Sequence, residues 1–160
     1  MFRTLFICCL LVFCSSAFSL EIFLFRHAEK QAGQDPELTL QGKARAERLA
    51  ELIAPLQPTL LFSTDYLRTT QTIAPLAKVV NLPVQIYNPK NLNNFAKALS
   101  AMSGTVVVVG HSNTTPALLK ALTGINKTIP ESQFDVIYWL KKSPDGFSVV
   151  ETSSDLQALP

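Results

Sequence analysis

The sequence is short of the residues on which many structural and catalytic sites depend. Its 160 residues include only two histidines and three cysteines, and only 16% of them are charged. The cysteines are Cys8, Cys9 and Cys14, so none lies beyond residue 14. From that point on, the chain can form no disulfide, thiol nucleophile or cysteine-based zinc site. A single hydrophobic core must therefore stabilise the fold.

The chain also lacks a strong excess of charge of either sign. Its formal net charge is +2, and no run of lysine and arginine or stripe of basic and aromatic residues is present, which argues against binding of nucleic acid. No clustered set of histidine and carboxylate residues suggests a metal site, so neither a metal nor another cofactor is expected. Hydrophobic residues make up 48% of the chain, which favours a packed domain over a disordered chain. The length suits one such domain.

The N-terminal segment has the three parts of a secretory signal peptide. Arg3 supplies a positive charge, and an apolar stretch runs from Leu5 to Phe13. Ala17 and Ser19 are the small residues at the −3 and −1 positions of a cleavage site before Leu20. The apolar stretch is shorter than the ~20 residues of a typical membrane span.

These features predict a signal peptide over residues 1–19 and one folded domain over residues 20–160. After cleavage the domain would be periplasmic or secreted, with no stable membrane insertion. A segment that is retained as an anchor is the alternative. The sequence does not indicate an oligomeric state.

Short apolar runs alternate with amphipathic helical patterns along the rest of the chain. The β-branched run from Thr105 to Val109 is typical of a strand buried on both faces. Alternating strands and helices predict a three-layer α/β/α sandwich with a mostly parallel sheet and an antiparallel final pair. Strands are expected at residues 21–25, 59–62, 83–87, 105–109, 134–140 and 147–151. Helices are expected from the cap Thr39 to Ala54, from Asp65 to Val80 with a kink or a restart at Pro75, from 92 to 102, and from Pro116 to a residue just before Gly124.

Both histidines of the chain follow predicted strands. His27 comes directly after the first strand, and His111 follows the valine-rich strand. Arg26 precedes His27, and Arg68 follows the second strand. Because the carboxyl ends of parallel strands meet at one edge of the sheet, these four side chains should converge. The other two arginines of the domain are expected on a solvated helix face; they are Arg45 and Arg48.

Two guanidinium groups and two imidazoles at one site suit a phosphoryl group. Arginine offers forked donors that match phosphate oxygens, and a helix after His111 adds its amino end. His27 can act as nucleophile if its attacking nitrogen is unprotonated and a backbone carbonyl orients the other nitrogen. Arg26, Arg68 and His111 would stabilise the charge on the transferring group.

Four motifs in this order resemble the signatures of the histidine phosphatase superfamily, which has the phosphoglycerate-mutase-like fold. The resemblance implies that His27 becomes phosphorylated, that Arg26, Arg68 and His111 bind the phosphoryl group, and that Asn113 contacts the substrate. Lys30 can reach the mouth of the site from its position alone. The four motifs are Arg26-His27-Ala28-Glu29, Leu38-Thr39-Leu40-Gln41-Gly42, Ser63 with Arg68, Gln71 and Thr72, and Gly110-His111.

The general acid of such an enzyme has no clear counterpart in this sequence. Mutase-like members carry a glutamate after the third strand, where residues 88–94 contain no carboxylate, and phytase-like members carry an aspartate where Ser112 stands. Glu29, Asp35 and Asp65 are the nearby candidates. Glu29 either contributes to the substrate site or forms an ion pair with Arg26 or Lys30. Loss of the acid costs about 10²–10⁴-fold on poor leaving groups, so a broad phosphatase of phosphorylated small molecules or cell-envelope phosphates is favoured over a sugar-phosphate mutase.

Two alternatives remain open at this point. A non-catalytic module that binds phosphorylated ligands would need the same arginines but no nucleophile. A serine hydrolase is suggested by the sequence from Gly110 to Thr114, which resembles a nucleophile elbow centred on Ser112. Thr114 replaces the second glycine of that elbow, and no histidine follows Ser112 to act as its base.

Overall fold

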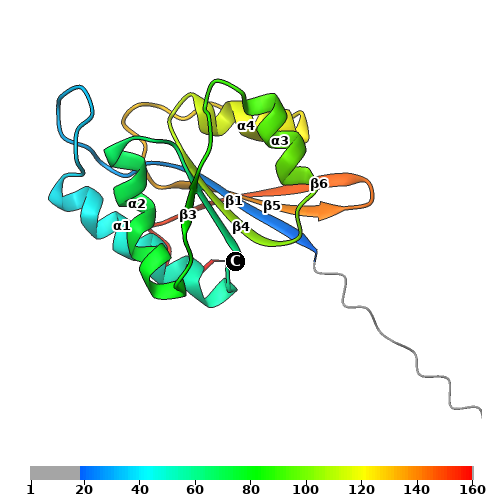
Figure 1. The fold of residues 1–160 in the computed structure, drawn as a ribbon, viewed down its shortest axis with the longest axis horizontal. Helices are drawn as coiled ribbons and strands as arrows, with labels where there is room; N and C mark the ends of the chain where they lie inside the picture. Colours follow the sequence, from blue (N-terminus) through cyan, green and yellow to red (C-terminus); the bar gives the residue numbers. More distant parts are fainter. Residues whose placement is uncertain (1–18, 160) are drawn as a thin grey trace, which may run out of the picture.

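The computed structural model describes residues 19–159, so the predicted signal peptide lies outside the described residues except for Ser19. One six-stranded sheet, in the order β3-β2-β4-β1-β5-β6, runs through the domain (Figure 1). The strands are β1 (Leu20–Arg26), β2 (Leu60–Ser63), β3 (Val84–Ile86), β4 (Gly104–Gly110), β5 (Val136–Ser143) and β6 (Gly146–Ser153). The first four are parallel to one another, and β5 and β6 are antiparallel to their neighbours.

Helices cover both faces of the sheet, which confirms the predicted three-layer sandwich. The helices α1 (Leu40–Ile53) and α2 (Leu67–Val80) pack together on one face, and α3 (Leu92–Ser100) and α4 (Thr114–Thr123) pack on the other (Figure 1). A short 3-10 helix, η1 (Ala54–Leu56), follows α1. No helix within residues 19–159 is both long and apolar enough to cross a membrane.

The two central strands divide their side chains between two hydrophobic layers. Ile22 and Leu24 of β1 pack toward α3 and α4, whereas Phe23 and Phe25 pack toward α1 and α2. The valines of β4 alternate in the same way, and all four are buried. Each such side chain contributes about 1.5–3 kcal/mol when it is fully buried. The rigid centre of the sheet therefore fixes the strand ends that carry His27 and His111.

Helix α1 lies directly against the segment that follows β1. Thr39 caps the helix, as predicted, by accepting a hydrogen bond from the backbone N–H of Gly42 at 3.0 Å. A Cβ atom at Gly42 would overlap the backbone carbonyl of Glu29, so only glycine allows this approach. The Leu-Thr-x-x-Gly motif thus sets the distance between α1 and the segment carrying His27.

Two helices begin at other residues than the sequence predicted. Helix α2 begins at Leu67 rather than at Asp65, because its first N–H donates to the side chain of Asp35 at 3.1 Å. The helix also continues through Pro75 without a break. Helix α4 begins at Thr114, which makes Pro116 its third residue rather than its first.

Candidate active site

The register of β1 and β4 brings the two histidines together. Arg26 is paired with Gly110 across these parallel strands, and the N–H of His27 donates to the carbonyl of Gly110 at 2.9 Å. His27 and His111 each follow one residue later, and their ring centroids lie 5.6 Å apart. The predicted convergence at this edge of the sheet is therefore present.

A pocket of about 500 Å³ opens above these strand ends. Most of the residues predicted to form the site line it, including both histidines and Arg68. Lys30 and Asn113 are also on its wall, as is Lys90, which the sequence did not single out. Further lining residues are Tyr66, Pro89, Ser112, Thr114 and Glu131.

The His27 ring is held with one nitrogen free for chemistry. Its Nδ1 lies 2.8 Å from the backbone carbonyl of Ala28. Since a carbonyl can only accept, Nδ1 carries the proton and Nε2 is left with a free lone pair. Burial, together with the positive charges of Arg26 and Arg68, lowers the pKa of His27 to about 4 despite this hydrogen bond. His27 is therefore neutral at neutral pH, as a nucleophile requires.

A chain of hydroxyl groups fixes the tautomer of His111. Thr69 donates to backbone carbonyls, so its oxygen accepts from Thr64 at 2.9 Å. The Thr64 hydroxyl then accepts from Nε2–H of His111 at 3.0 Å, which leaves Nδ1 without a proton. Burial, followed by the charge of Arg68, lowers the pKa of His111 to about 4.

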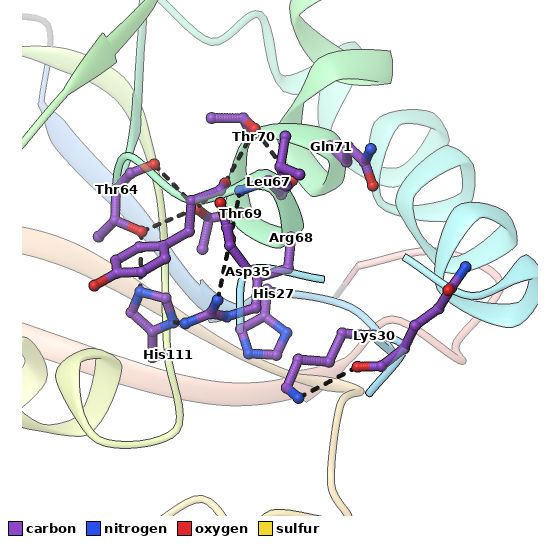
Figure 2. Close-up of polar contacts among 12 residues, drawn as sticks. His27, Lys30, Asp35, Thr64, Leu67, Arg68, Thr69, Thr70, Gln71 and His111 are labelled. Carbon is purple, nitrogen blue, oxygen red and sulfur yellow. Dashed lines mark hydrogen bonds and ion pairs between the residues drawn. The ribbon is translucent and has the colours of Figure 1, made fainter. Parts of the chain in front are cut away.

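Arg68 reaches between the two imidazoles from the first turn of α2 (Figure 2). Its Nη2 lies 3.4 Å from Nδ1 of His111, and its Nη1 lies 3.4 Å from the carboxylate of Asp35. The guanidinium also stacks on the ring of Tyr66, with 4.4 Å from Cζ to the centroid. The buried Nε of Arg68 has no hydrogen-bond partner in the protein.

Arg26 is anchored by the loop between α4 and β5 and is not among the residues that line the pocket. Its side chain is only 1% exposed. Nη1 donates to the backbone carbonyls of Pro130, Glu131 and Gln133 at 2.9–3.1 Å, and Nη2 contacts the Glu131 carboxylate at 3.1 Å. The buried Nε again has no partner in the protein. The donors of Arg26 that the protein leaves unused are therefore Nε and one N–H of Nη2.

Glu29 is not brought to the pocket lining. Its carboxylate binds Arg45 through contacts of 2.8–3.0 Å, so the predicted ion pair with Arg26 or Lys30 is wrong. Arg45 also binds Ser154 and Asp155, and its side chain is largely buried rather than on a solvated face. These contacts attach the segment after β1 to α1 and to the C-terminal residues.

The remaining motif residues support the backbone around His27. The side-chain oxygen of Gln71 accepts from the N–H of Leu38 at 2.8 Å. Thr72 accepts from the N–H of Ala28 at 2.9 Å and donates to the carbonyl of Arg68. The third motif is thereby tied to the first through Ala28 and to the second through Leu38.

Glu131 is a pocket carboxylate that sequence reasoning missed. It lies in the irregular loop between α4 and β5, about twenty residues beyond the last motif and outside any helical or strand periodicity. Its carboxylate meets Arg26 and the hydroxyl of Ser112. No local pattern in the sequence identifies such a contact. Among residues 19–159, no group of three or more histidine, cysteine or carboxylate side chains lies close enough together to hold a metal ion.

Burial of the two neutral histidines should make the protein less stable in mild acid. Their pKa values are about 4 in the folded protein and have the ordinary value of about 6.5 in the unfolded chain. Between about pH 4 and pH 6.5 the unfolded chain therefore binds more protons than the folded protein. The stabilisation is complete above about pH 6.5 and is lost as the pH falls toward 4. Between pH 7 and pH 5, we expect each histidine to lower the free energy of unfolding by about 1–2 kcal/mol. Urea unfolding at both pH values measures the loss, and the variant carrying His27→Gln and His111→Gln should not show it.

The fold and the pocket together define a class of protein. Imidazoles and buried guanidiniums at the carboxyl ends of parallel strands form an anion site built for phosphoryl chemistry. The sequence model of the histidine phosphatase superfamily, branch 1, matches residues 22–89. This match covers less than half of the chain, and over that part the chain is similar to the superfamily. No curated protein matches it significantly in sequence.

Solved structures share this fold over most of the chain. An Agrobacterium tumefaciens protein assigned as the phosphohistidine phosphatase SixA is 21% identical, with a TM-score of 0.65, and covers 83% of this chain and 97% of its own. The mycobacterial glucosyl-3-phosphoglycerate phosphatase Rv2419c, in complex with inorganic phosphate, is 15% identical, with a TM-score of 0.67 and coverage of 86% and 99%. An Escherichia coli protein assigned as an α-ribazole-5'-phosphate phosphatase is 14% identical, with a TM-score of 0.73 and coverage of 89% and 98%. At these identities the similarity shows a shared fold.

Proposed function

We propose that this chain is an exported, metal-independent phosphatase that hydrolyses phosphate monoesters through a phosphohistidine on His27. Arg26, Arg68 and His111 bind the phosphoryl group, and Lys30 and Asn113 contact the rest of the substrate. The substrate is a phosphorylated small molecule or a phosphate group of the cell envelope.

This proposal rests on two hydrogen-bond donors of arginine side chains that have no acceptor in the protein. The Nε atoms of Arg26 and Arg68 are both buried without a hydrogen-bond partner in the protein, and such donors are rare because they are costly. A bound phosphoryl oxygen supplies the acceptor that each of them lacks. Arg68 and His27 line one pocket, so the Arg68 donors and the free Nε2 of His27 can act on the same phosphoryl group.

The reaction has two steps at this site. Nε2 of His27 attacks phosphorus, the bond to the leaving-group oxygen breaks, and the arginines stabilise the negative charge that spreads over the phosphoryl oxygens. His111 adds to this stabilisation once Nδ1 takes up a proton from solution, because a neutral Nδ1 acceptor repels a phosphoryl oxygen. Water then attacks the phosphohistidine and releases inorganic phosphate.

Export is supported by the sequence pattern of residues 1–19 and by the start of the fold. Strand β1 begins at Leu20, directly after the predicted cleavage position, and the Leu20 side chain is buried. A mature chain that begins at this residue retains every strand and helix of the domain.

The alternative with Ser112 as nucleophile receives no support from its contacts. The Ser112 hydroxyl donates to Glu131, whereas Nε2 of His111 is hydrogen-bonded to Thr64. No imidazole is hydrogen-bonded to the serine to act as its base. The binding module remains the competing proposal, since it needs the same arginines.

Hydrolysis of p-nitrophenyl phosphate in EDTA by residues 20–160 tests the proposal. Its aryl leaving group needs little help from an acid, so the assay depends mainly on the nucleophile. We expect turnover in EDTA, and we expect an alkaline quench followed by mass spectrometry to locate a phosphoryl group on His27. Protein that binds inorganic phosphate but releases no nitrophenol and forms no phosphohistidine would instead be the binding module.

A further inference from the structure

Glu131 is the only carboxylate among residues 19–159 that lines the pocket. The three candidate acids from the sequence are placed differently. Glu29 is paired with Arg45, Asp35 caps α2 and contacts Arg68, and Asp65 is not part of the lining. If the reaction uses a side-chain carboxyl as proton donor, Glu131 is the candidate that remains at the pocket.

The main chain of Glu131 is anchored, while its side chain lies at the solvent-exposed edge of the pocket. Arg26 binds the backbone carbonyls of Pro130, Glu131 and Gln133. These bonds fix this part of the loop next to the end of β1, which His27 follows. The Glu131 side chain itself is 80% exposed. A carboxyl group that is anchored at its base and exposed at its tip can meet a leaving group that extends from the pocket into solvent.

In the ligand-free pocket this carboxyl group is ionised. The hydroxyl of Ser112 lowers the pKa of Glu131 below its ordinary value, and Arg26 and His27 add to this effect, although partial burial opposes it. A phosphate dianion bound at His27 would reverse the balance, because it draws on the donors of Arg26 and places negative charge beside the carboxylate. Substrate binding therefore favours the protonated form that a general acid needs.

We propose that Glu131 is the general acid and base of the reaction, an inference that rests on the proposed phosphatase function. As Nε2 of His27 bonds to phosphorus and the P–O bond breaks, the Glu131 carboxyl transfers its proton to the departing oxygen, which leaves as an alcohol. The Glu131 carboxylate then accepts a proton from the water that attacks the phosphohistidine. Inorganic phosphate leaves, and both side chains return to their initial states.

The decisive comparison is between an alkyl and an aryl phosphate in the variant Glu131→Gln. The values of kcat/KM for glycerol phosphate and p-nitrophenyl phosphate report only the steps up to formation of the phosphohistidine, so the shared hydrolysis step does not enter. For the alkyl substrate we expect a fall of about 100-fold or more, since an alkoxide leaves poorly without a proton. For the aryl substrate we expect a change of less than about fivefold, since its leaving group is stable as an anion.

Controls separate this role from a structural one. Glutamine still offers an oxygen to Arg26 and Ser112, and binding of inorganic phosphate checks that the pocket is intact. Glu51→Gln, which changes an exposed carboxylate on α1, should leave the ratio of the two kcat/KM values unaltered. In the wild type, kcat/KM for the alkyl phosphate should fall at alkaline pH, where the acid loses its proton. In the Glu131→Gln variant this alkaline fall should be absent.

An equal loss on both substrates, together with weaker phosphate binding, would mean that Glu131 only positions Arg26 and would overturn the proposal. No loss on either substrate would overturn it as well. These outcomes differ from failure of the proposed function, in which the wild-type protein itself would not hydrolyse p-nitrophenyl phosphate.

Discussion

Replacing His27 by glutamine should lower the turnover of p-nitrophenyl phosphate in EDTA by at least about 10⁴-fold, since a nucleophile contributes most of the rate in enzymes of this kind. Glutamine has no ring nitrogen that can form a bond to phosphorus. The change leaves both guanidiniums and His111 in place, so binding of inorganic phosphate should persist. Steady-state kinetics and isothermal titration with inorganic phosphate measure the two effects separately.

The matched control for this variant is His111→Gln. Both histidines are buried, both have a pKa of about 4, and their rings lie 5.6 Å apart, so the two changes perturb the pocket similarly. Because His111 stabilises charge and forms no covalent bond in the proposal, its loss should cost about 10²–10³-fold and should still allow phosphohistidine to form. Phosphohistidine formation in His27→Gln protein would show that the nucleophile is misassigned.

Replacing Arg68 by lysine should lower kcat/KM by about 10²–10³-fold even though the positive charge is kept. Arg68 uses one nitrogen on Asp35, a second on His111 and a buried third, Nε, that has no partner in the protein. An ammonium group cannot occupy these three directions from one stem, and it loses the stacking on Tyr66. Affinity for inorganic phosphate should fall together with kcat/KM.

Arg48→Lys is the control for this change. Arg48 is the arginine of α1 that pairs with Glu51 and does not line the pocket, so this substitution should leave kinetics and phosphate binding within about twofold of wild type. If Arg68→Lys behaves in the same way, the forked geometry of Arg68 plays no part in binding and only its charge matters.

The centre of the fold and of the site could be predicted because it follows from local patterns. The valine run identified β4 as a strand buried on both faces, and the parallel sheet then required His27 and His111 to meet at neighbouring strand ends. A backbone carbonyl that orients one ring nitrogen of His27 was also predicted, since a histidine nucleophile needs its other nitrogen unprotonated. These are contacts between adjacent strands or adjacent residues.

The contacts that could not be predicted join segments far apart in the sequence through irregular loops. Asp35 caps a helix that begins 32 residues later, and Arg26 meets Glu131 across 105 residues. Neither loop has a periodicity that indicates the direction of its side chains. The Glu29–Arg45 pair was missed for a related reason, because Arg45 faces the segment after β1 only once Gly42 has allowed α1 to approach it.

The position of β1 has a consequence for the order in which the chain is synthesised. This strand is the first part of the domain to leave the ribosome, yet its two neighbours in the sheet are β4 and β5, which begin at residues 104 and 136. Its backbone therefore stays without strand partners until most of the chain has been made. A nascent chain of this topology cannot complete its sheet until β5 and β6 have been made, so the non-local strand pairing comes late in its folding.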